Sequence, residues 1–204
     1  MNRPSQVTAA VSAFNQVART MPTLFILAGL PATGKTTLAR RIAQQHNAMH
    51  LRIDTIEQAL RDLCGLHVQG EGYRLAYRIA ADNLRLGLSV VADSCNPIEL
   101  TRREWEQVAV TNAAEFVNIE VTCGDVDAHR RRVECRTCDI DGLRLPTWQA
   151  VMDREYNDWS RDRIIVDTAK RSADQCLTIV ERELPEITKK AAPGNAPESR
   201  SGAS

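Results

Sequence analysis

The sequence predicts an α/β fold in which helices cover both faces of a parallel sheet. Short segments rich in Val and Ile alternate with longer segments of helical periodicity from residue 23 to residue 184, a pattern typical of strand–helix–strand units. A glycine-rich segment, Gly29 to Thr36, lies between the first strand-like segment and the first helical one. With 204 residues, the chain has the size of one domain with a substantial core.

Five segments have strand character, because each is short, apolar and separated from the next by a helical pattern. The first precedes the glycine-rich segment, and the last lies near residue 165. The predicted strands are Leu24–Ala28, Met49–Ile53, Ser89–Ala92, Glu115–Thr122 and Arg163–Asp167.

Seven segments have helical periodicity. Asn96 is expected to cap the fourth, since Pro97 suits the first turn of a helix, and Pro185 is expected to end the seventh. The predicted helices are Thr36–Gln45, Thr55–Leu63, Gly72–Leu86, Pro97–Asn112, Asp125–Thr137, Thr147–Asn157 and Ser172–Leu184.

The domain is expected to span residues 23–185, with a mobile helical insert, a lid, at about 125–147 between the fourth and fifth strands. Residues 1–22 alternate small and polar side chains and are interpreted as a peripheral helix or a loose lead-in. Residues 186–204 end in a segment rich in Ala, Pro, Gly and Ser, which predicts a disordered tail.

Composition excludes several classes of protein. The 26 basic and 26 acidic residues balance, whereas a dedicated nucleic-acid binder usually carries a basic excess. Six cysteines are too few for a disulfide scaffold, and no apolar stretch approaches the 18 residues of a membrane span. No secretory signal is evident near the first residue, so a cytoplasmic protein is expected. The oligomeric state has no signal in the sequence.

The glycine-rich segment reads G-L-P-A-T-G-K-T and matches the phosphate-binding P-loop, GxxxxGK[ST], between a strand and a helix. Its glycines allow backbone amides to turn inward around phosphate oxygens, and the following helix directs its positive end at the same anion. Lys35 is expected to reach the β- and γ-phosphates of ATP, and the Thr36 hydroxyl to bind Mg²⁺. The candidate nucleotide-binding residues are Gly29, Leu30, Pro31, Ala32, Thr33, Gly34, Lys35, Thr36 and Thr37.

The third predicted strand helps to separate P-loop classes. It ends in V-V-A-D-S, so Asp93 can contribute to a Mg²⁺ site or contact an acceptor. Motor-type ATPases usually place a water-activating Glu after that Asp, but Ser94 stands here. The guanine-reading tetrad N-K-x-D of GTPases is also missing from the sequence. Transfer to a bound hydroxyl is therefore favoured over hydrolysis.

Asp54 is expected at the carboxyl end of the second strand, where ligands lie in open α/β sheets. A carboxylate there can accept the proton of an attacking alcohol, as in kinases. The alternative is structural, since Asp is also a favoured cap for the helix predicted from Thr55. Both roles can hold together.

The predicted lid contains H-R-R-R-V-E-C-R, residues 129–136. Arg132 and Arg136 are four residues apart and are expected to share a helix face, from which both can contact the transferring phosphoryl group. Arg130 and Arg131 are interpreted as a solvated face. Cys135 and Cys138 form C-x-x-C, but no second such pair follows, so two ordinary thiols are expected rather than a metal or redox site.

Together these motifs resemble the small P-loop kinases of the AAA_33 or zeta-toxin-like group, which includes gluconate kinase, adenylylsulfate kinase and the kinase domain of polynucleotide kinase. The resemblance covers residues 23–184 and rests on L-A-G-L-P-A-T-G-K-T-T, R-I-D-T-I-E-Q-A-L, V-V-A-D-S-C-N-P and the lid sequence. It implies a P-loop NTPase fold with five parallel strands in the order 2-3-1-4-5 and a lid over ATP. It also implies Asp54 as the base and phosphate contacts from Arg132 and Arg136.

The resemblance implies an ATP- and Mg²⁺-dependent kinase whose partner is a small molecule with a hydroxyl group. Polynucleotide kinase carries an Arg three residues after its base, where this chain has Glu57, so a nucleic-acid substrate is disfavoured. A toxin-like or nucleic-acid 5′-hydroxyl kinase and a module that binds ATP without transfer stay open as alternatives. The sequence does not identify the acceptor.

Overall fold

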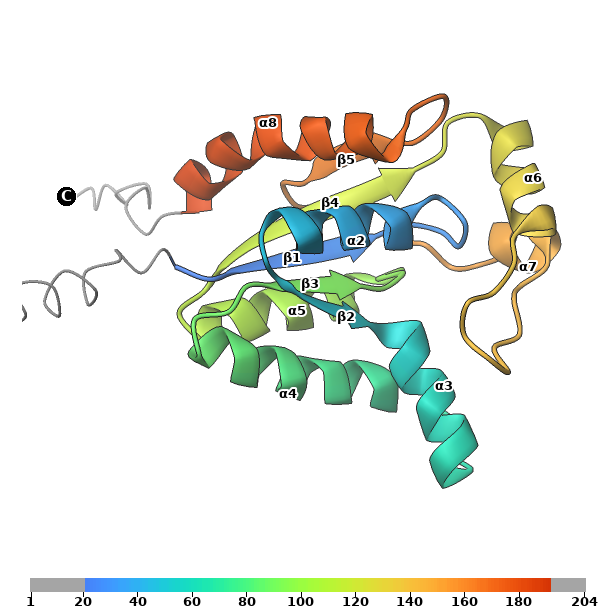
Figure 1. The fold of residues 1–204 in the computed structure, drawn as a ribbon, viewed down its shortest axis with the longest axis horizontal. Helices are drawn as coiled ribbons and strands as arrows, with labels where there is room; N and C mark the ends of the chain where they lie inside the picture. Colours follow the sequence, from blue (N-terminus) through green and yellow to red (C-terminus); the bar gives the residue numbers. More distant parts are fainter. Residues whose placement is uncertain (1–20, 192–204) are drawn as a thin grey trace, which may run out of the picture.

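The computed structural model describes residues 21–191, and their centre is a five-stranded sheet (Figure 1). Every neighbouring pair of strands is parallel, and the order is β2-β3-β1-β4-β5. The predicted α/β class, the P-loop NTPase fold and the implied strand order are thus confirmed. The strands are β1 (Thr23–Ala28), β2 (Met49–Arg52), β3 (Val90–Asp93), β4 (Glu115–Thr122) and β5 (Ile164–Asp167).

The helices form two layers, one on each face of the sheet, with a smaller group beyond the strands' carboxyl ends (Figure 1). The layers follow from the alternation of side chains along β1: Phe25 and Leu27 pack with α2 and α8, whereas Leu24 and Ile26 pack with α4 and α5. The helices are α2 (Lys35–Gln45), α3 (Ile53–Cys64), α4 (Glu71–Arg85), α5 (Glu99–Thr111), α6 (Val126–Cys135), α7 (Trp148–Met152) and α8 (Ala173–Ala191).

Three expectations about helix ends were wrong. Asn96 does not cap α5, whose N-cap is Ile98; instead Asn96 is fully buried and its side-chain amide donates to Leu27 O at 2.6 Å. The helix α7 ends at Met152, well before Asn157, and the carbonyls of residues 157 and 158 accept hydrogen bonds from the side chain of Arg102 on α5. Pro185 does not end α8, which continues to Ala191. A proline removes only one helical donor, and the flanking Glu, Leu and Lys residues favour helix.

The last helix therefore continues beyond the domain boundary expected at residue 185 and includes residues 186–191. The remaining predicted tail and residues 1–20 of the predicted lead-in lie outside the described residues. Within residues 21–191, no helix combines the length and the apolar character that crossing a membrane requires.

Arg102 joins the loop after β3 to the segment before β5. This side chain is 1% exposed, and its guanidinium group stacks over Trp159 with 4.0 Å to the ring centroid. It donates to four backbone carbonyls, two in the loop after β3 and two in the segment before β5: Asn96 O, Pro97 O, Asn157 O and Asp158 O. The five donors of a guanidinium group make such a connection possible. Arg102 thereby holds the segment that leads from the lid back to β5 against the loop that follows Asp93.

Candidate active site

The P-loop connects β1 to α2, and its shape depends on two glycines. Gly29 has φ +138°, and a Cβ atom there would lie 2.2 Å from the carbonyl oxygen of Val121 on β4. Gly34 has φ +102° and is the N-cap of α2. Ala32 also has a positive φ of 64°, which is uncommon for a residue with a side chain. These conformations turn the loop so that the amides at the start of α2 face one side.

Lys35 is the first residue of α2 and is only 7% exposed. Its Nζ donates to the carbonyl oxygen of Leu30 at 2.7 Å, so the ammonium group lies across the loop. Thr33 is only 3% exposed, and its Oγ1 closes the same turn by donating to Leu30 O at 3.0 Å. The loop is thus held by its own side chains with a positive charge at its centre.

Asp93 is the last residue of β3, and its side chain is 3% exposed. Its Oδ2 lies 3.1 Å from Nε2 of His50 on β2, the partner that compensates the burial of this carboxylate. Asp93 and Thr36 line one cleft, and their carboxylate and hydroxyl oxygens are the ligand types that Mg²⁺ takes. Among the described residues no three His, Cys, Asp or Glu side chains converge, so bound Mg²⁺ would also need phosphate and water oxygens.

Asp54 lies in the first turn of α3 rather than at the end of β2, because the strand ends at Arg52 and the helix begins at Ile53. The cap alternative is also wrong, since the N-cap is Arg52 and no side chain caps this helix. Asp54 is exposed and lines the cleft, so its carboxylate is accessible to a ligand. An acidic side chain in the first turn is favourable with the helix dipole.

The lid helix α6 is capped by Asp125, whose Oδ1 accepts from the amide of Ala128 at 2.9 Å. His129 is 6% exposed, and its Nε2 lies 2.8 Å from the carbonyl oxygen of Pro31 in the P-loop. Because a carbonyl only accepts, the His129 nitrogen is the donor. This bond joins the lid to the phosphate-binding loop.

Arg132 and Arg136 both line the cleft, as expected, but they do not share a helix face. The helix ends at Cys135, and Arg136 is its C-cap with an extended backbone. Its Nε is buried and has no hydrogen-bond partner. Arg130 pairs with Glu134 on the exposed side of α6, at 2.8 Å, which agrees with its interpretation as part of a solvated face.

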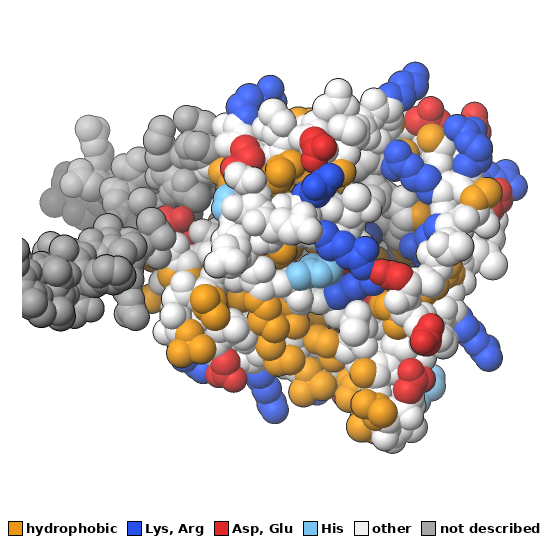
Figure 2. All heavy atoms as spheres, in the orientation of Figure 1, with side chains coloured by type: hydrophobic (Ala, Val, Ile, Leu, Met, Phe, Trp, Pro, Cys, Tyr) orange, Lys and Arg blue, Asp and Glu red, His pale blue; other side chains and the backbone are white. Residues whose placement is uncertain are grey.

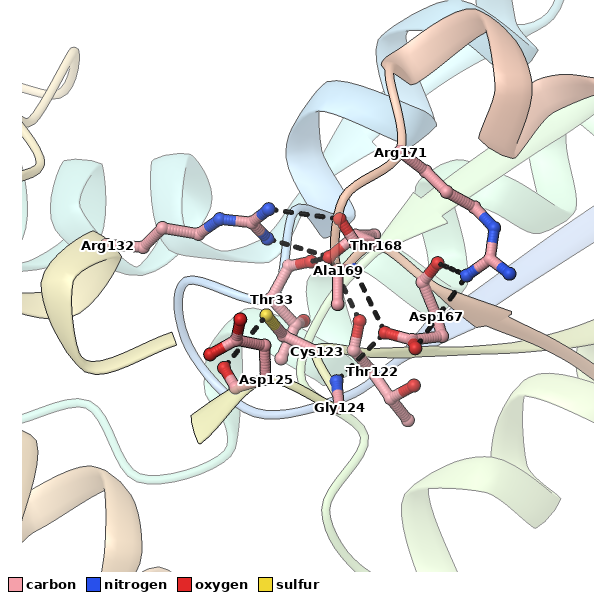
Figure 3. Close-up of polar contacts among 10 residues, drawn as sticks. All are labelled: Thr33, Thr122, Cys123, Gly124, Asp125, Arg132, Asp167, Thr168, Ala169 and Arg171. Atoms are coloured by element: carbon pink, nitrogen blue, oxygen red, sulfur yellow. Dashed lines mark hydrogen bonds and ion pairs between the residues drawn. The ribbon is translucent and has the colours of Figure 1, made fainter. Parts of the chain in front are cut away.

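Thr168, directly after β5, connects the lid and the P-loop (Figure 3). Its hydroxyl accepts from Arg132 Nη1 at 2.7 Å, and its carbonyl accepts from Arg132 Nη2 at 3.0 Å. The same hydroxyl lies 2.7 Å from Thr33 O and 3.0 Å from Thr122 O. Asp167 beside it accepts from the amides of Gly124 and Ala169, which hold its pKa below the usual value.

A second contact joins the lid to the core. Asp139, in the loop after α6, forms ion pairs with Arg40 on α2 and with Arg52 at the end of β2. The Asp139–Arg52 distance is 2.8 Å. The hydrogen bonds from both guanidinium groups hold the pKa of Asp139 well below its usual range. The loop is thus anchored at the edge of the cleft.

These elements enclose a cleft of about 730 Å³ at the carboxyl ends of the strands. Figure 2 shows basic side chains gathered on this part of the surface, around a carboxylate and a histidine. The lining includes nine basic side chains and four carboxylates, although the whole chain is neutral. They are Lys35, Arg40, Arg52, Arg61, Arg132, Arg136, Arg144, Arg154 and Arg171, with Asp54, Glu57, Asp93 and Asp139.

The cleft contains all of the predicted catalytic and metal-binding residues, and from the P-loop it contains Pro31, Ala32, Gly34, Lys35, Thr36 and Thr37. Gly29, Leu30 and Thr33 do not line it and act by shaping the loop. Sequence reasoning missed Thr168, the Asp139 ion pairs and the His129 contact with the loop. Cys135 and Cys138 are exposed, and Cys138 Sγ contacts Ile140 O at 3.2 Å.

Comparison of the fold with solved structures finds several proteins of low sequence identity, kinases among them. A gluconokinase from Sinorhizobium meliloti is 15% identical over 83% of this chain and 95% of its own, with a TM-score of 0.60. The APS kinase CysC from Mycobacterium tuberculosis, in complex with AMPPNP and APS, is 18% identical over 81% and 98%, with a TM-score of 0.59. Kti12 from Chaetomium thermophilum, in complex with ADP-AlF3, is 23% identical over 80% and 98%, with a TM-score of 0.56.

At these identities the neighbours establish the shared fold. No curated protein matches this chain. The AAA_33 family, described as an AAA domain, matches residues 24–147, which include the P-loop, Asp54, Asp93 and the lid arginines. Since this match spans more than half of the chain, the protein belongs to the AAA_33 family.

Proposed function

We propose that this chain transfers the γ-phosphoryl group of ATP to a hydroxyl of a small molecule, with Mg²⁺ as cofactor. The observation that carries the proposal is the joint presence of Lys35, Asp54 and Arg132 on the lining of one cleft. Each comes from a different element, so their meeting is a property of the fold rather than of a local motif.

In this proposal the P-loop amides and Lys35 hold the β- and γ-phosphates, and Arg132 and Arg136 neutralise charge on the transferring group. Thr36 and Asp93 would hold Mg²⁺, which would supply positive charge beside the phosphates. Thr168 already fixes Arg132 through two hydrogen bonds, which limits the reorganisation needed in the transition state.

Asp54 would orient the acceptor hydroxyl and accept its proton. Its exposure in the first turn of α3 leaves the carboxylate accessible to an alcohol bound in the cleft. A base in this position needs to reach the hydroxyl only when the acceptor is bound, so its role depends on the geometry of the ternary complex.

The test combines a screen with two variants. Sugars, nucleosides, nucleotide sugars, antibiotics and oligonucleotides are incubated with ATP labelled at the γ-phosphate, and labelled products are sought. With the acceptor that is found, we expect Lys35→Ala and Arg132→Ala to lower kcat on the order of 10³-fold or more, because each removes transition-state charge stabilisation.

Asp54→Asn is expected to lower kcat while leaving MgATP affinity, measured by calorimetry, unchanged. Transfer by Asp54→Asn at the wild-type rate would remove the role of Asp54 as base. Slow, stoichiometric consumption of ATP across the whole panel would instead favour a module that binds ATP without transfer, and labelled oligonucleotide would favour a nucleic-acid kinase.

A further inference from the structure

The acceptor end of the cleft is formed by α3 and by the segment that returns from the lid. Asp54, Glu57 and Arg61 line the cleft from successive turns of α3, at the spacing of three and four residues that places side chains on one face. The returning segment packs against this helix, since a Cβ atom at Gly142 would lie 3.0 Å from Nε2 of Gln58. Arg144 and Arg154 line the cleft from this second wall.

The charges of this end are only partly balanced. Glu57 accepts from Arg61 Nη2 at 3.2 Å and is thereby committed to that arginine. By contrast, Arg144 and Arg154 are exposed, and neither forms an ion pair with another described residue. Arg154 lies within electrostatic range of Glu57, but that carboxylate already accepts a hydrogen bond from Arg61. Among the described residues, neither Arg144 nor Arg154 therefore has a paired carboxylate of its own at the acceptor end of the cleft.

ATP does not account for these two arginines. In the proposed function the phosphates are bound by Lys35 of the P-loop and by Arg132 and Arg136 at the lid helix, all of which line the cleft. The pair formed by Arg40 and Arg52 already holds the Asp139 carboxylate, which shows that guanidinium pairs at this cleft bind an oxyanion. A guanidinium group presents two parallel donors that match the oxygens of a phosphate or carboxylate.

We infer that the acceptor carries an anionic group, a phosphate or a carboxylate, which Arg144 and Arg154 bind while its hydroxyl lies at Asp54. This inference rests on the proposed function for the place of the hydroxyl, but not for the binding of the anion. The anion neutralises the two unpaired arginines, and Arg61, held in place by Glu57 and Gln58 Oε1, contributes positive charge to the same wall.

The first test measures anion binding without turnover. The full chain is saturated with Mg²⁺ and AMPPNP, so that the P-loop is filled, and inorganic phosphate is then titrated by calorimetry. The double variant Arg144→Gln with Arg154→Gln is expected to weaken phosphate binding by about 10-fold or more, since charged hydrogen bonds are lost. AMPPNP affinity is expected to stay at the wild-type value.

Arg85→Gln is the matched control, because Arg85 is also exposed and lies on α4 outside the lining of the cleft; within residues 21–191 its ion-pair partner is Asp82. It should leave phosphate affinity unchanged. Equal phosphate affinity in the double variant and the wild type, or no phosphate binding by the wild type, would overturn the inference.

The second test identifies the anion by comparing alcohols of one skeleton. Glycerol 3-phosphate and glycerate are each compared with glycerol for binding to the AMPPNP-loaded chain, and the anionic member is expected to bind more tightly and to lose this advantage in the double variant. Equal binding of glycerol and both anions would contradict the inference. Arginine-dependent anion binding without transfer to any alcohol would instead count against the proposed function alone.

Discussion

Glu57 is a residue of the cleft whose ionised side chain lowers the stability of the native state. Its side chain is 20% exposed, and this burial raises its pKa, against the attraction of Arg61. The native state therefore binds a proton more readily than the unfolded chain, so native stability falls as pH rises through the range just above 4.5, the ordinary pKa. At pH 7 the ionised Glu57 lowers the free energy of unfolding.

Glu57→Gln is therefore expected to raise the free energy of unfolding at pH 7, because the neutral amide does not carry the cost of burying a charge; a change on the order of 1 kcal/mol is the usual size for a single substitution. The gain should disappear below pH 4, where Glu57 is protonated in both states. Urea denaturation at both pH values measures it. Glu134→Gln, at an exposed position paired with Arg130, is the control and should show no such gain. A destabilised Glu57→Gln at pH 7 would show that the Arg61 pair outweighs burial.

At the scale of elements, the P-loop depends on Gly29, because a side chain there would disturb the pairing of β1 with β4. Gly29→Ala combines the backbone strain of φ +138° with a Cβ atom 2.2 Å from the Val121 carbonyl, so β1 and β4 would have to separate locally. We expect a loss of at least about 3 kcal/mol in the free energy of unfolding. Chemical denaturation measures this loss.

Gly65→Ala is the matched control for Gly29→Ala. Gly65 also has a positive φ, +63°, but within the described part of the chain a Cβ placed there would meet no atom within 4 Å beyond its immediate chain neighbours. It should cost only about 1 kcal/mol, the ordinary penalty of left-handed backbone. Similar losses at the two positions would mean that strain, rather than the contact with β4, sets the requirement for Gly29.

The connection made by Arg102 is expected to depend on the shape of its side chain as well as its charge. Arg102→Lys keeps one positive charge but cannot serve four carbonyls in two loops, so buried acceptors lose donors. A loss of about 3 kcal/mol is expected in urea denaturation. The neighbouring Arg103 is exposed, and Arg103→Lys should be neutral. A neutral Arg102→Lys would show that water or the backbone replaces the lost donors.

At the scale of the whole molecule, the layers and most strand bounds could be predicted from sequence because they are local. The alternation of Phe25 and Leu27 with Leu24 and Ile26 lies within one strand, and helical periodicity is visible in windows of similar length. Pro185 is the exception, since a proline's local preference predicts a helix end although the helix continues on both sides of it.

The candidate site was predictable where its residues belong to compact motifs, as with Lys35 and Asp93. The rest depends on pairs that are distant in sequence: Thr168 contacts Thr33 across 135 residues, and Asp139 contacts Arg40 across 99. No periodicity or spacing encodes such pairs. The position of Asp54 shows a smaller failure of the same kind, since the strand ends one residue earlier than its apolar pattern indicates and the helix begins at once.

The cleft draws on segments from the P-loop to α8, so a ligand that bridges them should stabilise the entire domain. MgATP at about 100 times its Kd is expected to raise the free energy of unfolding by about 2.7 kcal/mol, because only the native state assembles the site. Removal of Mg²⁺ with EDTA should reduce this gain, and Lys35→Ala should abolish most of it while Arg85→Gln keeps it. Denaturation with and without nucleotide measures each effect. The buried ammonium group of Lys35 lies across the P-loop, so a triphosphate bound there must meet its charge. If MgATP stabilised Lys35→Ala as much as the wild type, the nucleotide would bind outside the P-loop.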